Sequence, residues 1–218
     1  SVLSDSERKD SKHDFGRDIL PRLFGTHKLM AYDFSTNVLP GDDKPYWKDV
    51  GSIKAYWEAH MDLLRHESPL SLYNPQWPIR TVSYSDPPGF TYPDKDHSCS
   101  VDGCLRAEAS RVLGAYVRKS VLSRNCIIHA GSVVEECIIG QGVEIGEDCR
   151  LRRVIVDAHN KIPAGTSIGF DPVADAERYH VDPASGIVVV GMPQIQLRKE
   201  KNVPGTYDAL QNAEDLGF

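Results

Sequence analysis

Aliphatic residues recur six residues apart, with one five-residue step, through the second half of this 218-residue chain. The series consists of Ile127, Val133, Ile139, Ile145, Leu151, Val156, Ile162 and Ile168. The fifth place of each hexad holds a small or apolar residue, namely Gly131, Cys137, Val143, Cys149, Ile155 or Thr166. Such a period is typical of a left-handed parallel β-helix, in which each hexad forms one flat side of a triangular coil and successive coils bury their aliphatic side chains.

Composition excludes several broad classes of protein. The formal net charge is −6, whereas general nucleic-acid binding favours basic faces. No stretch approaches the ~20 apolar residues that span a bilayer, and the start of the chain carries no secretory signal pattern. We therefore expect a cytoplasmic protein that binds neither nucleic acid nor membrane. The polar opening, SVLSDSERKDSKHDFG, lacks an initiator Met, so we expect the chain to be part of a longer polypeptide.

The cysteines are odd in number and lack paired CxxC spacing. They are Cys99, Cys104, Cys126, Cys137 and Cys149. This pattern favours reduced thiols over a disulfide framework. Cys137 and Cys149 fall on hexad positions, where small hydrophobic residues inside the coil are favoured over metal ligands.

Changes in composition and in apolar spacing along the sequence divide the chain into four parts. Residues 1–85 form a mixed part with candidate helices and strands, and residues 86–100 are expected to be a proline-rich linker. The β-helix is expected over residues 101–197, followed by a polar tail over 198–218.

Apolar spacing within the first part predicts three local elements. A short helix is expected over residues 15–24, and alternation of apolar residues predicts a strand pair over 27–39. A longer helix with aromatic residues is expected over 49–64, with Ser52 as its cap.

The motifs HDFGRDILP, PYWKDVGSIKAYWEAHMDLL, YNPQWPIRT, DCRLRRVIVD and IPAGTSIGFDPVADAERYHV occur here in one order. Together they resemble the carboxy-terminal half of bacterial ADP-glucose pyrophosphorylase, also called glucose-1-phosphate adenylyltransferase, over roughly residues 10–197. The resemblance implies synthesis of ADP-glucose and pyrophosphate from ATP and glucose 1-phosphate for glycogen or starch, with Mg²⁺ as cofactor. It also implies that residues 1–85 are the end of a Rossmann-like nucleotidyltransferase domain, and that the left-handed β-helix after it serves assembly and regulation.

The phosphate-binding part of such an enzyme is missing from this sequence. No GxGxxG occurs, and the glycines of residues 140–146 belong to the hexapeptide repeat. Nucleotidyl transfer brings several anionic oxygens together and needs cations to offset them. We therefore expect the isolated chain to be inactive.

The resemblance assigns catalytic and substrate-binding residues to two of these motifs. Asp49, in YWKDVGS, is expected to be the catalytic metal ligand for Mg²⁺, which takes oxygen ligands. Without the resemblance, Asp49 would be interpreted as a helix-start residue whose negative charge is stabilised by the amino-terminal end of the helix dipole. Trp47 is expected to line the sugar-phosphate pocket, with burial in a core as the alternative, and Asp14 and Phe15 to lie at the edge of the sugar pocket.

Two further interpretations concern the β-helix. Arg150, Arg152 and Arg153 form a cluster suited to phosphorylated sugar or nucleotide effectors, because the planar guanidinium binds phosphate bidentately. The resemblance implies an activator arginine after Asp157, but this position is Ala158, which puts sugar-bisphosphate activation of the best-known type in doubt.

The alternatives are a non-catalytic regulatory module, or an acyltransferase that uses a coil histidine, His129 or His159, as general base. The resemblance implies tetramers for the full-length enzyme. For this chain we expect a dimer formed through the β-helix, with Val121–Val134 as the buried coils.

Overall fold

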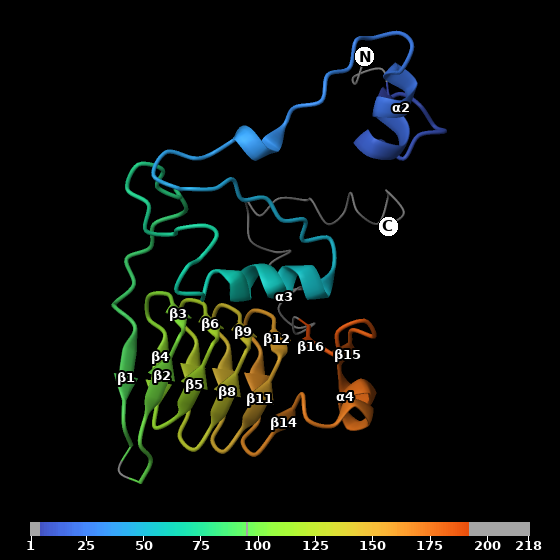
Figure 1. Cartoon of the computed structure of the whole chain (residues 1–218). Helices are drawn as coiled ribbons and strands as arrows, with labels where there is room; N and C mark the ends of the chain where they lie inside the picture. Colours follow the sequence, from blue (N-terminus) through green and yellow to red (C-terminus); the bar gives the residue numbers. More distant parts are fainter. Residues whose placement is uncertain (1–4, 95, 192–218) are drawn as a thin grey trace. The chain divides into compact units, whose positions relative to one another are not determined.

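The computed structural model describes residues 5–94 and 96–191 (Figure 1). The chain divides into two compact units, Ser1–Pro45 and Tyr46–Phe218, which are described separately.

The first unit is built from short helical turns. A π-helical turn, η1 (Phe15–Ile19), continues directly into α2 (Leu20–Leu23), so the expected helix over 15–24 is present in two parts. The expected strand pair over 27–39 is wrong. The described segment contains a 3₁₀ turn, η2 (Phe34–Thr36), instead. Asp33 starts this turn by accepting a hydrogen bond from the Ser35 N–H at 3.0 Å, a local side-chain bond that competes with strand pairing.

The second unit begins with an extended segment and the helix α3 (Ile53–Asp62). Ser52 is its N-cap and accepts a hydrogen bond from the Ala55 N–H at 3.2 Å, which satisfies one of the free donors of the first turn. The cap expected from the sequence is therefore confirmed. An irregular segment follows and leads to β1 (Phe90–Tyr92), which lies inside the range 86–100 assigned to a linker and already pairs with the coils.

The remaining strands form three sheets that wind into a parallel β-helix (Figure 1). The first sheet has the order β1, β4 (Arg111–Leu113), β7 (Ile127–Ile128), β10 (Glu144–Ile145), β13 (Lys161–Ile162). The second has β14 (Ser167–Ile168), β11 (Arg150–Arg152), β8 (Val133–Glu135), β5 (Tyr116–Arg118), β2 (Ser100–Asp102). The third has β15 (His180–Val181), β16 (Val188–Val190), β12 (Val154–Val156), β9 (Ile138–Ile139), β6 (Val121–Leu122), β3 (Leu105–Arg106). The fold class expected from the hexads, a left-handed hexapeptide β-helix, is confirmed.

Strand pairing fixes the length of a coil. Arg111 pairs with Ile127, sixteen residues on, whereas Ile127 pairs with Glu144 and Glu144 with Lys161, each seventeen residues on. A coil of seventeen residues consists of two six-residue sides and one five-residue side.

The inward-facing column corrects the register of two hexads. Ile128 and Val134 are fully buried, whereas Ile127 and Val133, placed in the column by the sequence analysis, are half-buried on the outer face. The six-residue series therefore missed one five-residue step, between Val134 and Ile139. The shorter step turns at Glu136, whose φ of 53° lies in the left-handed region. From Ile139 onward the expected column is correct.

Small side chains fill the corners next to this column. Cys126, Cys137 and Cys149 have no exposed surface, which confirms the interior placement of the latter two. Burial raises the pKa of the Cys126 thiol to about 11 and that of Cys137 to about 12. Serine hydroxyls bridge neighbouring coils: Ser132 Oγ donates to the Gly146 carbonyl at 2.7 Å and accepts from the Cys149 N–H at 3.0 Å.

The last described coil is covered by α4 (Pro172–Arg178) and the antiparallel pair β15–β16. Buried Asp175 on α4 accepts a hydrogen bond from the Gly169 N–H at 2.8 Å, and Tyr179 and Val181 pack against the core cluster. None of the helices among the described residues is long and apolar enough to cross a membrane.

Candidate functional site

Asp49 lies in the irregular segment before α3 and forms an Asx-turn with Gly51, called here the Asp49 turn. Its side chain is exposed, and Oδ1 accepts a hydrogen bond from the Gly51 N–H at 3.0 Å. A Cβ atom at Gly51 would lie 3.2 Å from the same oxygen, so the carboxylate and the glycine backbone are in close approach. Because Ser52 caps α3, Asp49 lies outside the helix and does not act as its cap.

Trp47 and Lys48 precede this carboxylate and differ in their environment. The Trp47 side chain is 72% exposed, so in this structure it belongs to no core. Lys48, which the sequence analysis did not assign to the site, is bound to α3. Its Nζ lies 2.6 Å from Asp62 Oδ2 and 3.9 Å from Glu58 Oε2. No sequence signal marks this pair, because Lys48 and Asp62 are fourteen residues apart and only one of them is helical.

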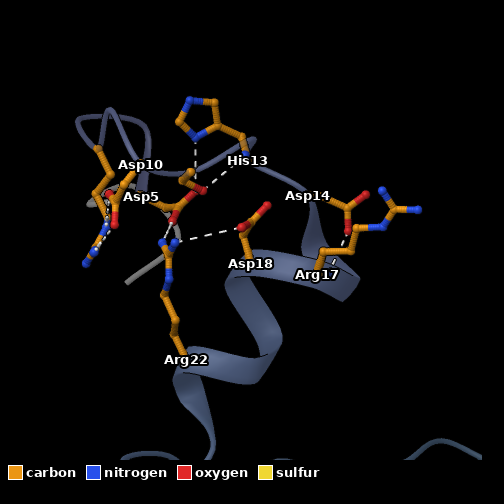
Figure 2. A network of polar contacts seen from close by, with 9 residues as sticks. Asp5, Asp10, His13, Asp14, Arg17, Asp18 and Arg22 are labelled. Atoms are coloured by element: carbon orange, nitrogen blue, oxygen red, sulfur yellow. Dashed lines mark hydrogen bonds and ion pairs between the residues drawn. The ribbon is translucent and has the colours of Figure 1, made fainter.

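Asp14 and Phe15 lie in the first unit, in a segment rich in charged contacts (Figure 2). Asp14 is the N-cap of η1 and accepts a hydrogen bond from the Arg17 N–H at 2.7 Å, and the Phe15 side chain is 58% exposed. Both residues are thus accessible within their own unit.

The nearby carboxylate of Asp5 is buried and holds this segment together. It accepts from Ser11 Oγ at 2.7 Å, lies 2.9 Å from His13 Nδ1 and pairs with Arg22 (Figure 2). The hydrogen bonds from His13 and Ser11 lower the pKa of Asp5.

The three arginines of the expected effector cluster point in two directions. Arg150 and Arg152 flank buried Leu151 on β11 and are exposed on the outer face of the second sheet. Arg150 lies 4.9 Å from the ring of Phe170. Arg153 turns the next corner with a φ of 55°, and its guanidinium lies 5.0 Å from the Trp57 ring of α3. The structure therefore keeps Arg150 and Arg152 together and places Arg153 at the contact with α3.

A groove of about 460 Å³ lies between the start of α3 and the third sheet. Residues 50–53 and Tyr56 form one side of it, and Ile155, Asp157 and Val189 form the other. The Asp49 turn therefore borders on the β-helix close to Asp157.

Known proteins match both parts of the chain. A family model described as "Nucleotidyl transferase" matches residues 1–66, and one described as "GlmU-like, C-terminal hexapeptide" matches residues 86–190. The glucose-1-phosphate adenylyltransferase of Photobacterium profundum is 40% identical over 187 residues, which are 85% of this chain and 46% of that protein. Glucose-1-phosphate adenylyltransferase 1 of Vibrio parahaemolyticus is 42% identical over 191 residues, 87% of this chain and 47% of the relative. That of Francisella tularensis subsp. novicida is 37% identical over 201 residues, 90% of this chain and 47% of the relative.

This chain is homologous to the bacterial glucose-1-phosphate adenylyltransferases. The resemblance drawn from the motifs is confirmed. The chain spans about half the length of the curated relatives that it matches, and the matched half is their carboxy-terminal part.

The described residues offer single carboxylates, but no complete set of protein ligands for a metal ion. No group of three His, Cys, Asp or Glu side chains suited to a metal ion occurs within residues 5–94 and 96–191. Asp49 alone offers an exposed, locally held carboxylate in the YWKDVGS motif. Mg²⁺ is commonly held by one or two carboxylates together with substrate phosphates, so a single carboxylate from this chain is compatible with it.

The coil histidines lie in different surroundings from Asp49. His129 Nε2 is 3.2 Å from Glu144 Oε1, and Lys161 Nζ is 3.0 Å from Glu144 Oε2, so all three side chains form one cross-strand group on the first sheet. Lys161 and His129 together lower the pKa of Glu144. His159 occupies a corner with a φ of 61° and lies against Gly142 of the preceding coil.

Proposed function

We propose that this chain is the carboxy-terminal part of a glucose-1-phosphate adenylyltransferase that forms ADP-glucose and pyrophosphate from ATP and glucose 1-phosphate. Homology over 85–90% of the chain with proteins of that name carries the proposal. In this reaction a phosphate oxygen of glucose 1-phosphate bonds to the α-phosphorus of ATP, and the bond to the β-phosphate breaks to release pyrophosphate.

We propose Asp49 as this chain's ligand for Mg²⁺, which when bound supplies positive charge against the phosphate oxygens. The hydrogen bond from the Gly51 N–H fixes the direction of the carboxylate, which reduces the loss of freedom on binding. Trp47 is proposed to contact the sugar phosphate through its exposed ring, and Asp14 and Phe15 to bind the sugar.

Regulation and assembly are proposed for the β-helix. Exposed Arg150 and Arg152 on one strand, with Arg153 at the adjoining corner, are suited to the phosphate groups of sugar-phosphate or nucleotide effectors. Tetramers are proposed for the complete enzyme, and the five unpaired thiols of the described residues support a reducing compartment such as the cytoplasm.

Acyl transfer is the weaker alternative, because the homology over most of this chain is with proteins named glucose-1-phosphate adenylyltransferase.

The test is Asp49→Asn in the complete enzyme. We expect turnover to fall by roughly 100-fold or more at limiting Mg²⁺, because one negative ligand is lost where charge develops. Asp43→Asn, which changes a carboxylate upstream of the YWKDVGS motif, is the matched control. Ordinary activity of Asp49→Asn at limiting Mg²⁺ would remove Asp49 from the site.

A further inference from the structure

Lys48 joins the Asp49 turn to α3 at close range. Its ammonium lies 2.6 Å from Asp62 Oδ2, and the two side chains are only 25% and 13% exposed. A charge-assisted hydrogen bond at this distance and depth is stronger than a surface ion pair, because water competes less for both groups. The residue next to Asp49 is therefore fastened to the far end of the helix.

The second fixed point is the start of the same helix. Ser52 Oγ accepts from the Ala55 N–H at 3.2 Å, and α3 begins at the following residue. Asp49 thus lies in a short segment whose two ends, Lys48 and Ser52, are both held by α3. Within that segment the Gly51 N–H orients the carboxylate itself.

The helix is in turn seated on a corner of the β-helix. Trp57 Nε1 donates a hydrogen bond to the main-chain carbonyl of Glu136 at 2.8 Å. The Arg153 guanidinium, one coil further on, lies 5.0 Å from the Trp57 ring and donates to the Ser185 carbonyl at 3.4 Å. The corners of two successive coils therefore hold α3 by the same indole ring.

We propose that Lys48 is a positioning residue for Asp49, and that the β-helix, through Trp57 and α3, is the rigid body against which this carboxylate is held. The inference rests on the proposed function. A metal ligand supplied by a single side chain has to be held to within about 0.5 Å of its productive position by neighbouring contacts. Lys48 supplies such a contact although it is not itself a metal ligand.

We expect the fold itself to tolerate the loss of Lys48. Asp62 Oδ1 also pairs with Arg65 at 3.2 Å, so replacing Lys48 leaves this largely buried carboxylate with a cationic partner. Lys48→Met, which keeps a long unbranched side chain, therefore changes the Asp49 turn without leaving an unpaired buried charge.

The experiment compares Lys48→Met with Lys54→Met in the complete enzyme. Both lysines lie 3.9 Å from Glu58, but only Lys48 reaches Asp62, so Lys54→Met is a matched loss of charge. Hydrogen exchange of residues 46–52 is measured first, without Mg²⁺ or substrates. Lys48→Met is expected to accelerate it roughly tenfold, as the loss of a charge-assisted hydrogen bond predicts, and Lys54→Met to leave it unchanged.

Mg²⁺ dependence is the second readout. Lys48→Met is expected to raise the Mg²⁺ concentration for half-maximal rate by roughly tenfold with little change in the KM for glucose 1-phosphate, and Lys48→Arg to restore most of it. Trp57→Phe, which removes the donor to the Glu136 carbonyl and leaves Lys48 in place, is expected to shift both readouts in the same direction.

Asp49→Asn in the same series separates the two hypotheses. If Asp49→Asn is crippled but Lys48→Met matches Lys54→Met in exchange and in Mg²⁺ dependence, the positioning role is overturned and the proposed function stands. If Asp49→Asn is fully active, the proposed metal role fails whatever the exchange of residues 46–52 shows.

Discussion

Buried thiols should make the β-helix sensitive to alkaline pH. Cys126 and Cys137 are buried without exposed surface, and burial raises their pKa values from 9.0 to about 11 and about 12. Between pH 9 and 11 both thiols lose their protons when the chain unfolds but keep them in the folded state. The unfolded state then binds fewer protons, so the free energy of unfolding falls as pH rises.

The size of the effect follows from the shifts. At pH 10, about one unit above the unfolded pKa, each thiol lowers the free energy of unfolding by about 1.4 kcal/mol relative to pH 8, and the two together by about 3 kcal/mol. Other groups that titrate in this range contribute equally to the parent chain and to a variant that lacks only these two thiols, so they cancel in the comparison. The double variant Cys126→Ala/Cys137→Ala should therefore be less stable than the parent chain at pH 8. By pH 10 the difference in free energy of unfolding between the two should shrink by about 3 kcal/mol.

Urea unfolding followed by circular dichroism, with reductant present, measures this convergence. The matched control is Val143→Ala/Val154→Ala, since these fully buried valines occupy the equivalent corner positions one coil further on, seventeen residues after each cysteine. The control removes core volume without removing a thiol, so its deficit should stay constant with pH. A constant deficit in the cysteine variant as well would refute the assignment of alkaline sensitivity to these thiols.

Three further predictions use the coils and the incomplete site. Gly146→Ala should destabilise the β-helix by about 1–3 kcal/mol, because the new Cβ would lie 2.6 Å from the Ala164 backbone nitrogen. Gly191→Ala, whose new Cβ would meet none of the described residues within 4 Å, should be neutral in the same urea titration. The isolated chain should release no pyrophosphate from ATP and glucose 1-phosphate, since it lacks a phosphate-binding loop; release above a protein-free blank would contradict this. The same chain should sediment as a dimer at micromolar concentration through Val121–Val134, and a monomer at all concentrations would exclude that assembly.

The interior of the coils could be predicted from the sequence, because one aliphatic per strand repeats with little variation. The register of Ile128 and Val134 could not, since both have an aliphatic neighbour on the amino-terminal side and the choice depends on the corner at Glu136. A left-handed corner of a non-glycine residue leaves no mark in composition. The sequence pattern therefore predicts the fold more securely than it predicts which individual residues point into the coil.

The candidate site was predictable only in its exposed members. Asp49 and Trp47 were found through a motif, and the structure leaves both accessible. Lys48 was missed because its partner, Asp62, is brought close by the course of the chain and not by helical spacing. The cluster of Arg150, Arg152 and Arg153 was predicted as one surface, although a corner separates its last member.

Periodicity of the coils extends to the support of α3. The acceptor of the Trp57 indole is a main-chain carbonyl at a corner, and seventeen residues later the same corner is formed by Arg153. If residues 128–144 were excised, Ile145 would take the place of Ile128 in the inward column, and the carbonyl of Arg153 would stand where that of Glu136 stood. The coils thus repeat the corner carbonyl that accepts the hydrogen bond from the Trp57 indole. Whole coils could therefore be gained or lost during evolution without changing the contact between α3, which holds the Asp49 turn, and the β-helix.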